Sequence, residues 1–369
     1  MPQHHLSLVQ LLQKHFNLNL ARAKCLSAFV FTMISSRTIN LAIICESLPG
    51  DIQILSWYRR LQRFVVEVYL DQYSLSVIIA QIMELYSAPK WTLCMDRTNW
   101  RFGKQHINIL YLAVSWKMVA IPLFFCILED KSSGNSDHLD RIDLLESFIR
   151  VFGKERIKVL TADREFIGEL WLNYLENEEI PYVIRLKDHG QLMAAKNGVM
   201  KKINEIFCSL PPATVVNLRR KMGACKSSRN ITVTKNTNGE LLALVHSETI
   251  KSAISLYSER WQIETMFRAF KSSGFNSEAT HITDYDRLTT IMSVMAIAFA
   301  ISYKTGEIGD EHSPIKVKKH GYRARSIFRH GLAKLCKIFA DIGQRLVEWI
   351  TLYASIIKSC SVIEVKNVM

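Results

Sequence analysis

The sequence has few of the features that mark secreted, zinc-bound or membrane-spanning proteins. Its eight cysteines form no Cys-x-x-Cys pair and no Cys/His zinc spacing, so we expect reduced, mostly buried thiols in a cytoplasmic protein. The first residues, MPQHHLSLVQLLQKHF, are too polar for a signal peptide and predict an amphipathic helix. The longest apolar run, Leu288 to Ser302, is shorter than the roughly 20 residues that span a bilayer. We therefore expect a buried core helix there and no membrane partner.

Acidic residues are scarce relative to basic ones. The chain has 34 Asp and Glu against 47 Lys and Arg, which gives a formal net charge of +13. Such an excess favours a polyanionic partner, with nucleic acid first and an anionic membrane surface second, although a merely basic surface would give the same count. Internal repeats and low-complexity tracts are also absent from the sequence, which argues against a solenoid or a disordered chain.

The remaining sequence changes its periodicity along the chain. From Trp91, three apolar runs (WTLCMD, HINILYLAVSWK and IPLFFCILED) predict strands, and they are followed by a helix, a strand, a helix and a strand. This order predicts an α/β fold, a mixed sheet with helices on its faces. An Asn-Gly turn and short alternating segments then predict a β-rich insertion. The length of 369 residues suggests two or three domains. The regions we expect are helical 1–85, mixed 86–187, the β-rich insertion 188–250, helical 251–300 and basic helical 301–369.

The helical region 1–85 contains two helices around a Pro-Gly turn, which suggests a helix-turn-helix. The second helix has a basic face with Tyr58, Arg59, Gln62 and Arg63. Many helical hairpins have basic faces without binding DNA, so the alternative of an ordinary hairpin remains open. A second basic segment lies around Lys318 and Arg325. We expect both segments to contribute to DNA binding because of their charge density.

The stretch YSERWQIETMFRAFKSSGF, Tyr257 to Phe275, predicts one amphipathic helix. At about 100° per residue, offsets of three, seven and fourteen return to nearly the same face. Polar residues therefore form one stripe and apolar residues the opposite, buried face. The polar stripe comprises Tyr257, Arg260, Glu264 and Lys271, with Trp261 and Arg268 beside it; the apolar face comprises Ile263, Met266, Phe267 and Phe270. A solvated face with one stray carboxylate is the simpler alternative.

Two aspartates favour a functional role for Glu264. Asp96 ends the run WTLCMD and Asp163 ends IKVLTAD, so both are expected at the carboxyl edge of the sheet, where sites form in α/β proteins. Each Asp alone is equally typical of a turn or a helix cap. Three carboxylates without a His at ligand spacing suit a hard cation such as Mg²⁺ or Mn²⁺. Arg260, Arg268 and Lys271 could grip phosphates beside such ions.

These residues resemble a known family. Tyr257, Arg260, Glu264 and Lys271 match the Tyr-(2)-Arg-(3)-Glu-(6)-Lys signature of the bacterial insertion-sequence transposases of the fourth family, the cut-and-paste group. MDRTNW resembles the first Asp motif of that family, TADREF resembles its Asp-Arg-Glu motif, and YVIRL with Arg185 resembles its strand before the insertion. The resemblance covers at least residues 90 to 285.

The resemblance implies an RNase H-like fold with a β-rich insertion before the catalytic Glu. It implies Asp96, Asp163 and Glu264 as catalytic metal ligands for Mg²⁺, with Mn²⁺ able to substitute. Tyr257, Arg260 and Lys271 would contact phosphates of the transposon end, and a homodimer would hold both ends of the double-stranded DNA. The implied location is cytoplasmic and nucleoid-associated in a bacterium. Further DNA contacts are expected from Trp261, Arg268, Arg185, Arg59 and Arg63.

Relatives cut the end with water, form a DNA hairpin with the freed 3′-OH, reopen it and join the 3′ ends to target DNA. Trp261 would probe the gap left by a flipped base, or it packs at the helix edge. Some relatives stack the flipped base on a Trp of the insertion, and residues 188–256 contain none. Either another aromatic serves, or the hairpin step differs. Two other functions stay open: a nuclease that only hydrolyses DNA, and a catalytically silent DNA-binding protein. Glu165 is close enough in sequence to Asp163 to assist a metal.

Overall fold

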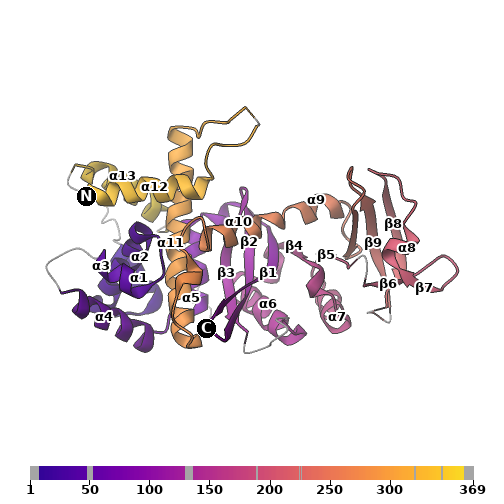
Figure 1. Ribbon diagram of the computed structural model, residues 1–369, viewed down its shortest axis with the longest axis horizontal. Helices are drawn as coiled ribbons and strands as arrows, with labels where there is room; N and C mark the ends of the chain where they lie inside the picture. Colours follow the sequence, from indigo (N-terminus) through magenta and orange to yellow (C-terminus); the bar gives the residue numbers. More distant parts are fainter. Residues whose placement is uncertain are drawn as a thin grey trace. The chain divides into compact units, whose positions relative to one another are not determined.

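The computed structural model describes two compact units (Figure 1). The described residues are 8–47, 53–128, 136–187, 190–223, 225, 227–319, 321–341 and 344–360. The first unit comprises the described residues within Met1–Ala88, Trp100–Ile107 and Met266–Met369, and the second those within Pro89–Asn99 and Asn108–Thr265.

Apart from Trp100–Ile107, where two strands of the sheet meet, the first unit is helical, as the sequence predicts for both ends of the chain. Its helices pack around α11, which contacts α2, α4, α5, α12 and α13. The turn with Pro49 and Gly50, on which the predicted helix-turn-helix depends, lies outside the described residues. The helices are α1 (Leu8–Phe16), α2 (Leu20–Ser36), α3 (Leu41–Glu46), α4 (Ile54–Glu67), α5 (Gln72–Ile82), η1 (Leu85–Ser87), η4 (Ser277–Ala279), α11 (Tyr285–His312), α12 (Ile327–Ala340) and α13 (Leu346–Cys360).

Helix α11 is longer than the apolar run that predicts it. It has 28 residues and begins at the side-chain cap of Asp284, whose carboxylate accepts from the backbone of Arg287. In length and composition it could cross a membrane, but 94% of its apolar window is buried inside the described protein. This burial is what a core helix requires, because an apolar surface on all sides must be covered.

The second unit is built on a mixed sheet, which confirms the predicted α/β class and the RNase H-like core with its β-rich insertion. The sheet has eight strands in the order β3-β2-β1-β4-β5-β10-β9-β8, where β1, β4 and β5 run parallel. Strands β2 and β3, two of the three strands predicted from Trp91 onward, pair antiparallel. The strands are β1 (Trp91–Phe102), β2 (Gln105–Trp116), β3 (Val119–Ile127), β4 (Ile157–Ala162), β5 (Tyr182–Arg185), β8 (Val215–Lys221), β9 (Ser228–Lys235) and β10 (Leu241–His246).

The insertion continues the main sheet, because β10 pairs antiparallel with β5. The Asn-Gly turn between β9 and β10 is present, and Gly239 has the positive φ of 83° that such turns require. A separate two-stranded sheet of β6 (Leu192–Ala194) and β7 (Met200–Lys202) and the short helix α8 (Ile203–Ile206) complete the insertion.

Helices cover both faces of the sheet in this unit. On one face, Trp91 packs edge-on against Phe148 and Phe152 of α6 (His138–Phe152). Helix α7 (Glu169–Asn177) packs beside α6. On the other face, Ala253 and Tyr257 of α9 (Ala253–Ser258) form a buried cluster with Val159 of β4, Val183 of β5 and Leu244 of β10. Because side chains alternate along β1, Asp96 shares its face of the sheet with Cys94.

Candidate active site

Two neighbouring parallel strands place the aspartates at one position of the sheet. Strand β1 pairs with β4 up to Met95 and Ala162, so the next residues, Asp96 and Asp163, lie beyond the last paired residues of the two strands. Asp163 directly follows β4, as predicted. The expectation that Asp96 ends its strand is wrong, because β1 continues to Phe102. Asp96 instead stands where β1 leaves β4 while remaining a strand.

The predicted single helix over Tyr257–Phe275 is also wrong. Helix α9 ends at Ser258, and α10 (Trp261–Phe270) begins after a break at Glu259 and Arg260. The hydroxyl of Ser115 donates to the carbonyl oxygen of Glu259 at 3.2 Å, and this contact holds the break against strand β2. Both side chains of the polar stripe next to the break are buried: Arg260 is only 4% exposed and Tyr257 is 5% exposed.

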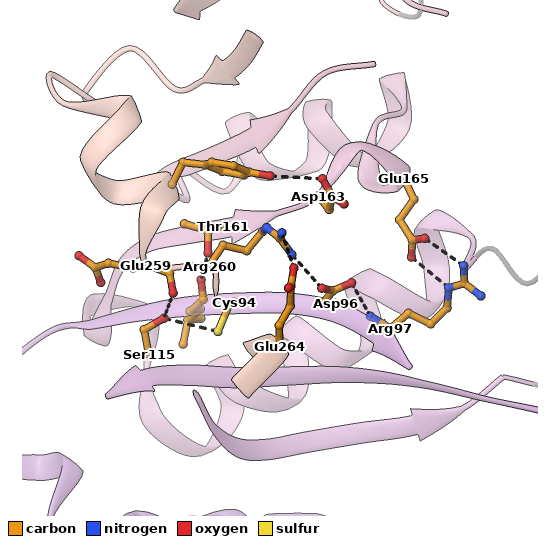
Figure 2. A network of polar contacts seen from close by, with 12 residues as sticks. Cys94, Asp96, Arg97, Ser115, Thr161, Asp163, Glu165, Glu259, Arg260 and Glu264 are labelled. Atoms are coloured by element: carbon orange, nitrogen blue, oxygen red, sulfur yellow. Dashed lines mark hydrogen bonds and ion pairs between the residues drawn. The ribbon is translucent and has the colours of Figure 1, made fainter. Parts of the chain in front are cut away.

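Arg260 bridges two of the three predicted carboxylates (Figure 2). Its Nη1 donates to Oδ2 of Asp96 and its Nη2 to Oε1 of Glu264, each at 2.9 Å. The ion pair with Glu264 spans one helical turn of the chain (i, i+4), and the pair with Asp96 joins segments that are far apart in sequence. Glu264 is therefore not a stray carboxylate on a solvated face.

Tyr257 attaches the third carboxylate to the same group. Its hydroxyl donates to Oδ1 of Asp163 at 3.2 Å, and the guanidinium of Arg260 lies 5.6 Å from the centre of its ring. Within the second unit, the structure thus brings Asp96, Asp163 and Glu264 together around Arg260, as the sequence predicts.

Burial dominates the electrostatics of this cluster. It raises the pKa of Asp96 to about 6, although the backbone N–H of Arg97 and the charge of Arg260 lower it. It also raises the pKa of Tyr257 to about 12, so the phenol is a neutral donor at physiological pH. Burial alone would lower the pKa of Arg260, but nearby Tyr257 and the carboxylates Asp96 and Asp163 hold it above its ordinary value. Arg260 is therefore a permanent cation.

A second arginine beside the cluster was not identified from the sequence. Arg97 forms two parallel hydrogen bonds to Glu165, both at 3.0 Å, and a third to Oδ1 of Asn108 at 3.2 Å. Its backbone N–H donates to Oδ1 of Asp96 at 2.8 Å. The carboxylate of Glu165 is engaged by Arg97, which favours a positioning role over the predicted assistance to a metal. The sequence offered one indication of this role, since Arg97 directly follows Asp96 in MDRTNW.

The donor set of the cluster fits a divalent cation in its chemistry. All the candidate ligands are carboxylate oxygens, which Mg²⁺ prefers, and three carboxylates share the single charge of Arg260. In their present arrangement, no three acidic, His or Cys side chains of the described residues are grouped closely enough to hold a metal. Asp96 and Glu264 are instead bridged by the guanidinium.

The other predicted DNA-binding residues differ in exposure. Trp261, at the start of α10, is 61% exposed. Its ring centre lies 5.6 Å from the guanidinium carbon of Arg260. Arg185, at the end of β5, is partly buried, and Arg268 on α10 is exposed. Lys271 forms an ion pair with Glu278 at 2.9 Å within the first unit.

The predicted basic surfaces of the first unit lie on α4 and on the loop before α12. Arg59 and Arg63 are exposed and line a cleft of about 710 Å³ together with Tyr58, Gln62 and Arg287. Lys318 and Arg325 are exposed in the loop between α11 and α12. The basic side chains that we expect to bind DNA are therefore exposed on α4 and in the loop before α12.

Comparison with known proteins gives the family. The cryo-EM structure of the piggyBac transposase synaptic complex with hairpin DNA matches with a TM-score of 0.48 and 11% sequence identity, over 95% of this chain and 78% of that one. A search among curated proteins finds no match. The sequence model of the family described as transposase DDE domain matches residues 87–301, which is more than half of the chain and includes Asp96, Asp163 and Glu264. The chain belongs to the family of transposases with a DDE domain.

Proposed function

We propose that this protein is an active transposase of a bacterial insertion sequence of the fourth, cut-and-paste family. It binds the terminal inverted repeats of its own element, cuts the DNA ends by metal-dependent phosphodiester hydrolysis and joins the 3′ ends to target DNA. The observation that carries the proposal is the cluster of three carboxylates, in which Arg260 bridges Asp96 and Glu264 and the Tyr257 hydroxyl binds Asp163. The four signature positions and the family match support it.

The roles of the residues follow from their chemistry. Asp96, Asp163 and Glu264 would hold Mg²⁺, with Mn²⁺ as a substitute; a pair of such ions activates the nucleophile and stabilises the leaving oxygen of a phosphodiester. Tyr257, Arg260, Arg268 and Lys271 bind phosphates of the transposon end, and Arg185 adds positive charge near Tyr257. Exposed Trp261 is available to stack at a flipped base.

Other parts of the chain bind the DNA away from the cutting point. Residues 1–85, with Arg59 and Arg63, form a DNA-binding region, and the basic region 301–369 adds contacts around Lys318 and Arg325. Residues 188–250 form the β-rich insertion of a catalytic core that runs over 86–187 and 251–300. A homodimer holds both ends, and the protein works in the bacterial cytoplasm at the nucleoid.

The test is made on the surroundings of the gene itself. Purified protein is incubated with a DNA fragment that holds the gene and its flanks, with and without Mg²⁺, and cuts are mapped on denaturing gels. We expect metal-dependent cuts at a pair of inverted repeats that disappear in Glu264→Gln while binding to the repeats persists. A band of hairpin DNA would establish that the second strand is cut through a hairpin intermediate. The sequence leaves this step open, because the insertion has no Trp to stack on a flipped base. Cuts that persist in Glu264→Gln would remove Glu264 from the mechanism.

Two alternatives predict different products. A nuclease of the same fold would give cuts but no strand-transfer product with a free 3′-OH donor. A catalytically silent DNA-binding protein would bind the repeats tightly without any cut. All three carboxylates of the cluster are present in the sequence. This favours the catalytic function over the second alternative, because a protein that no longer cuts DNA does not need to keep three metal-binding carboxylates.

A further inference from the structure

Arg260 occupies the carboxylate oxygens that a metal would need. Both oxygens of Asp96 are engaged: Oδ1 accepts from the backbone of Arg97 at 2.8 Å, and Oδ2 accepts from Arg260 at 2.9 Å. Arg260 also takes Oε1 of Glu264. A divalent ion bound by Asp96 and Glu264 would lie against the guanidinium, and two cations at such a distance in a buried place repel strongly. Metal and guanidinium therefore compete for the same ligands.

The contacts of Arg260 leave it able to exchange partners. Its Nε is buried and has no hydrogen-bond acceptor within the described residues, so the carboxylates do not satisfy the whole group. Its backbone stands at the break between α9 and α10, where Ser115 fixes the preceding carbonyl. A phosphate of DNA offers the guanidinium the same charge and a bidentate geometry that matches the planar fork.

We propose that Arg260 is an exchangeable counter-ion, which neutralises Asp96 and Glu264 in the free protein and moves to a DNA phosphate when DNA binds. The proposal rests on the proposed function, since it takes the carboxylates as metal ligands and DNA as the partner. DNA binding then opens the ligand set, and the metal enters mainly in the DNA complex. Because coupling between two ligands is reciprocal, metal would strengthen DNA binding by the same factor by which DNA strengthens metal binding.

The experiment measures metal binding without DNA. Mn²⁺ is titrated into DNA-free protein and followed by electron paramagnetic resonance, for the wild type, Arg260→Gln and Arg260→Ala. Removal of the competing cation should strengthen Mn²⁺ binding by about tenfold or more. The matched control is Arg219→Ala, which removes an exposed arginine of the same unit that is paired with Glu248 outside the cluster. It should leave Mn²⁺ affinity at the wild-type value.

A duplex carrying one inverted repeat from the flanks of the gene completes the test. It should strengthen Mn²⁺ binding in the wild type much more than in Arg260→Gln, where the ligand set is already open. Equal Mn²⁺ affinity of wild type and Arg260→Gln without DNA would overturn the proposal and make Arg260 a permanent partner of the carboxylates.

Two further controls separate this failure from others. Mn²⁺ binding by neither protein, with or without DNA, would contradict both the proposed ligand set and the exchange at it. Binding that survives Glu264→Gln in the Arg260→Gln background would place the ion elsewhere and overturn the proposal as well. Thermal melting checks the fold: the uncompensated carboxylates of the Arg260 variants should lower Tm without metal, and Mn²⁺ should raise Tm more than in the wild type.

Discussion

Two arginines bind carboxylates of the site, and they differ in how many carboxylates each one binds. Arg260 binds one oxygen each of Asp96 and Glu264, which come from different segments. Arg97 binds both oxygens of Glu165 alone. A bidentate pair fixes both partners in one plane, whereas a bridge between two carboxylates is open to competition at each of them. Arg97 is thus suited to positioning and Arg260 to exchange.

Because Arg97 pairs with Glu165, we expect that replacing Glu165 lowers the stability of the protein but leaves its binding of metal unchanged. Glu165→Gln should lower the free energy of unfolding by about 1–3 kcal/mol, because Arg97, only 14% exposed, keeps its charge and loses its carboxylate. Urea denaturation measures this cost. In a double-mutant cycle with Arg97→Gln, the two costs should not add, since both variants break one contact. Loss of Mn²⁺ binding in Glu165→Gln would contradict this positioning role and make Glu165 a ligand.

Tyr257 combines a core ring with a polar hydroxyl, and the two parts can be separated. Tyr257→Phe removes only the hydrogen bond to Asp163 and should cost about 0.5–1.5 kcal/mol of unfolding free energy. Tyr257→Ala empties a place in the buried cluster with Val159 and Val183 and should cost about 3–5 kcal/mol. Chemical denaturation of both variants gives the comparison. Equal costs would mean that the hydroxyl, not the ring, holds α9 on the sheet.

The sequence predicts which residues form the site but not how Arg260 is used. The spacing of Tyr257, Arg260 and Glu264 indicates that the three side chains share one face, but it does not show that Arg260 is buried against Asp96, a residue 164 positions earlier. The break at Glu259 and Arg260 has no Gly or Pro to mark it, and the side chain that binds its carbonyl is Ser115, 144 positions earlier. Local periodicity carries no information about such a long-range contact.

At the level of elements, α11 and α12 cross at glycines. A Cβ at Gly306 would lie 2.0 Å from the carbonyl oxygen of Ile327, and one at Gly331 would lie 1.9 Å from that of Ser302. Backbone cannot give way as a side-chain tip can, so these two positions set how closely the helices approach. The sequence shows only two unremarkable glycines in helical stretches, because nothing local distinguishes a close crossing from a weak helix position.

The crossing predicts a sharp difference between glycines of one helix. Gly306→Ala should destabilise the protein by about 1–3 kcal/mol or more through overpacking. Gly309→Ala is the matched control on α11, because its Cβ would meet only the imidazole of His330, at 3.0 Å. Its better helix propensity offsets up to about 1 kcal/mol of any cost. Thermal and urea denaturation of the two variants measure this difference. Equal losses of stability would mean that α11 and α12 can move apart at Gly306 without a cost in free energy.

The strands of the second unit were predictable because apolar runs of strand length alternate with periodic helices. The pairing of the insertion was not. Strand β10 joins β5 and extends the sheet to eight strands, but a strand shows its faces in the sequence and not its neighbours. Asp96 was misplaced for a related reason: β1 continues past it as RTNWRF, in which exposed and buried residues alternate only from Thr98 onward.

For the whole molecule, the excess of positive charge predicts how DNA binding responds to salt. Each phosphate contact by a Lys or Arg releases condensed counterions, so the logarithm of the binding constant falls with the logarithm of the salt concentration with a slope of about −0.9 per contact. The chain has a net charge of +13, and exposed Arg59 and Arg63 share one cleft.

The variant Arg59→Gln/Arg63→Gln should therefore make this slope shallower by about 1.8 and weaken binding most at low salt. Binding to an inverted-repeat duplex is measured over a range of salt concentrations. The control, Lys154→Gln/Lys201→Gln, removes the same charge from two exposed residues outside the predicted DNA-binding positions, and its slope should equal that of the wild type. If both double variants changed the slope equally, the attraction would come from the net charge and not from the face of α4. An unchanged slope in Arg59→Gln/Arg63→Gln alone would place the DNA away from this cleft.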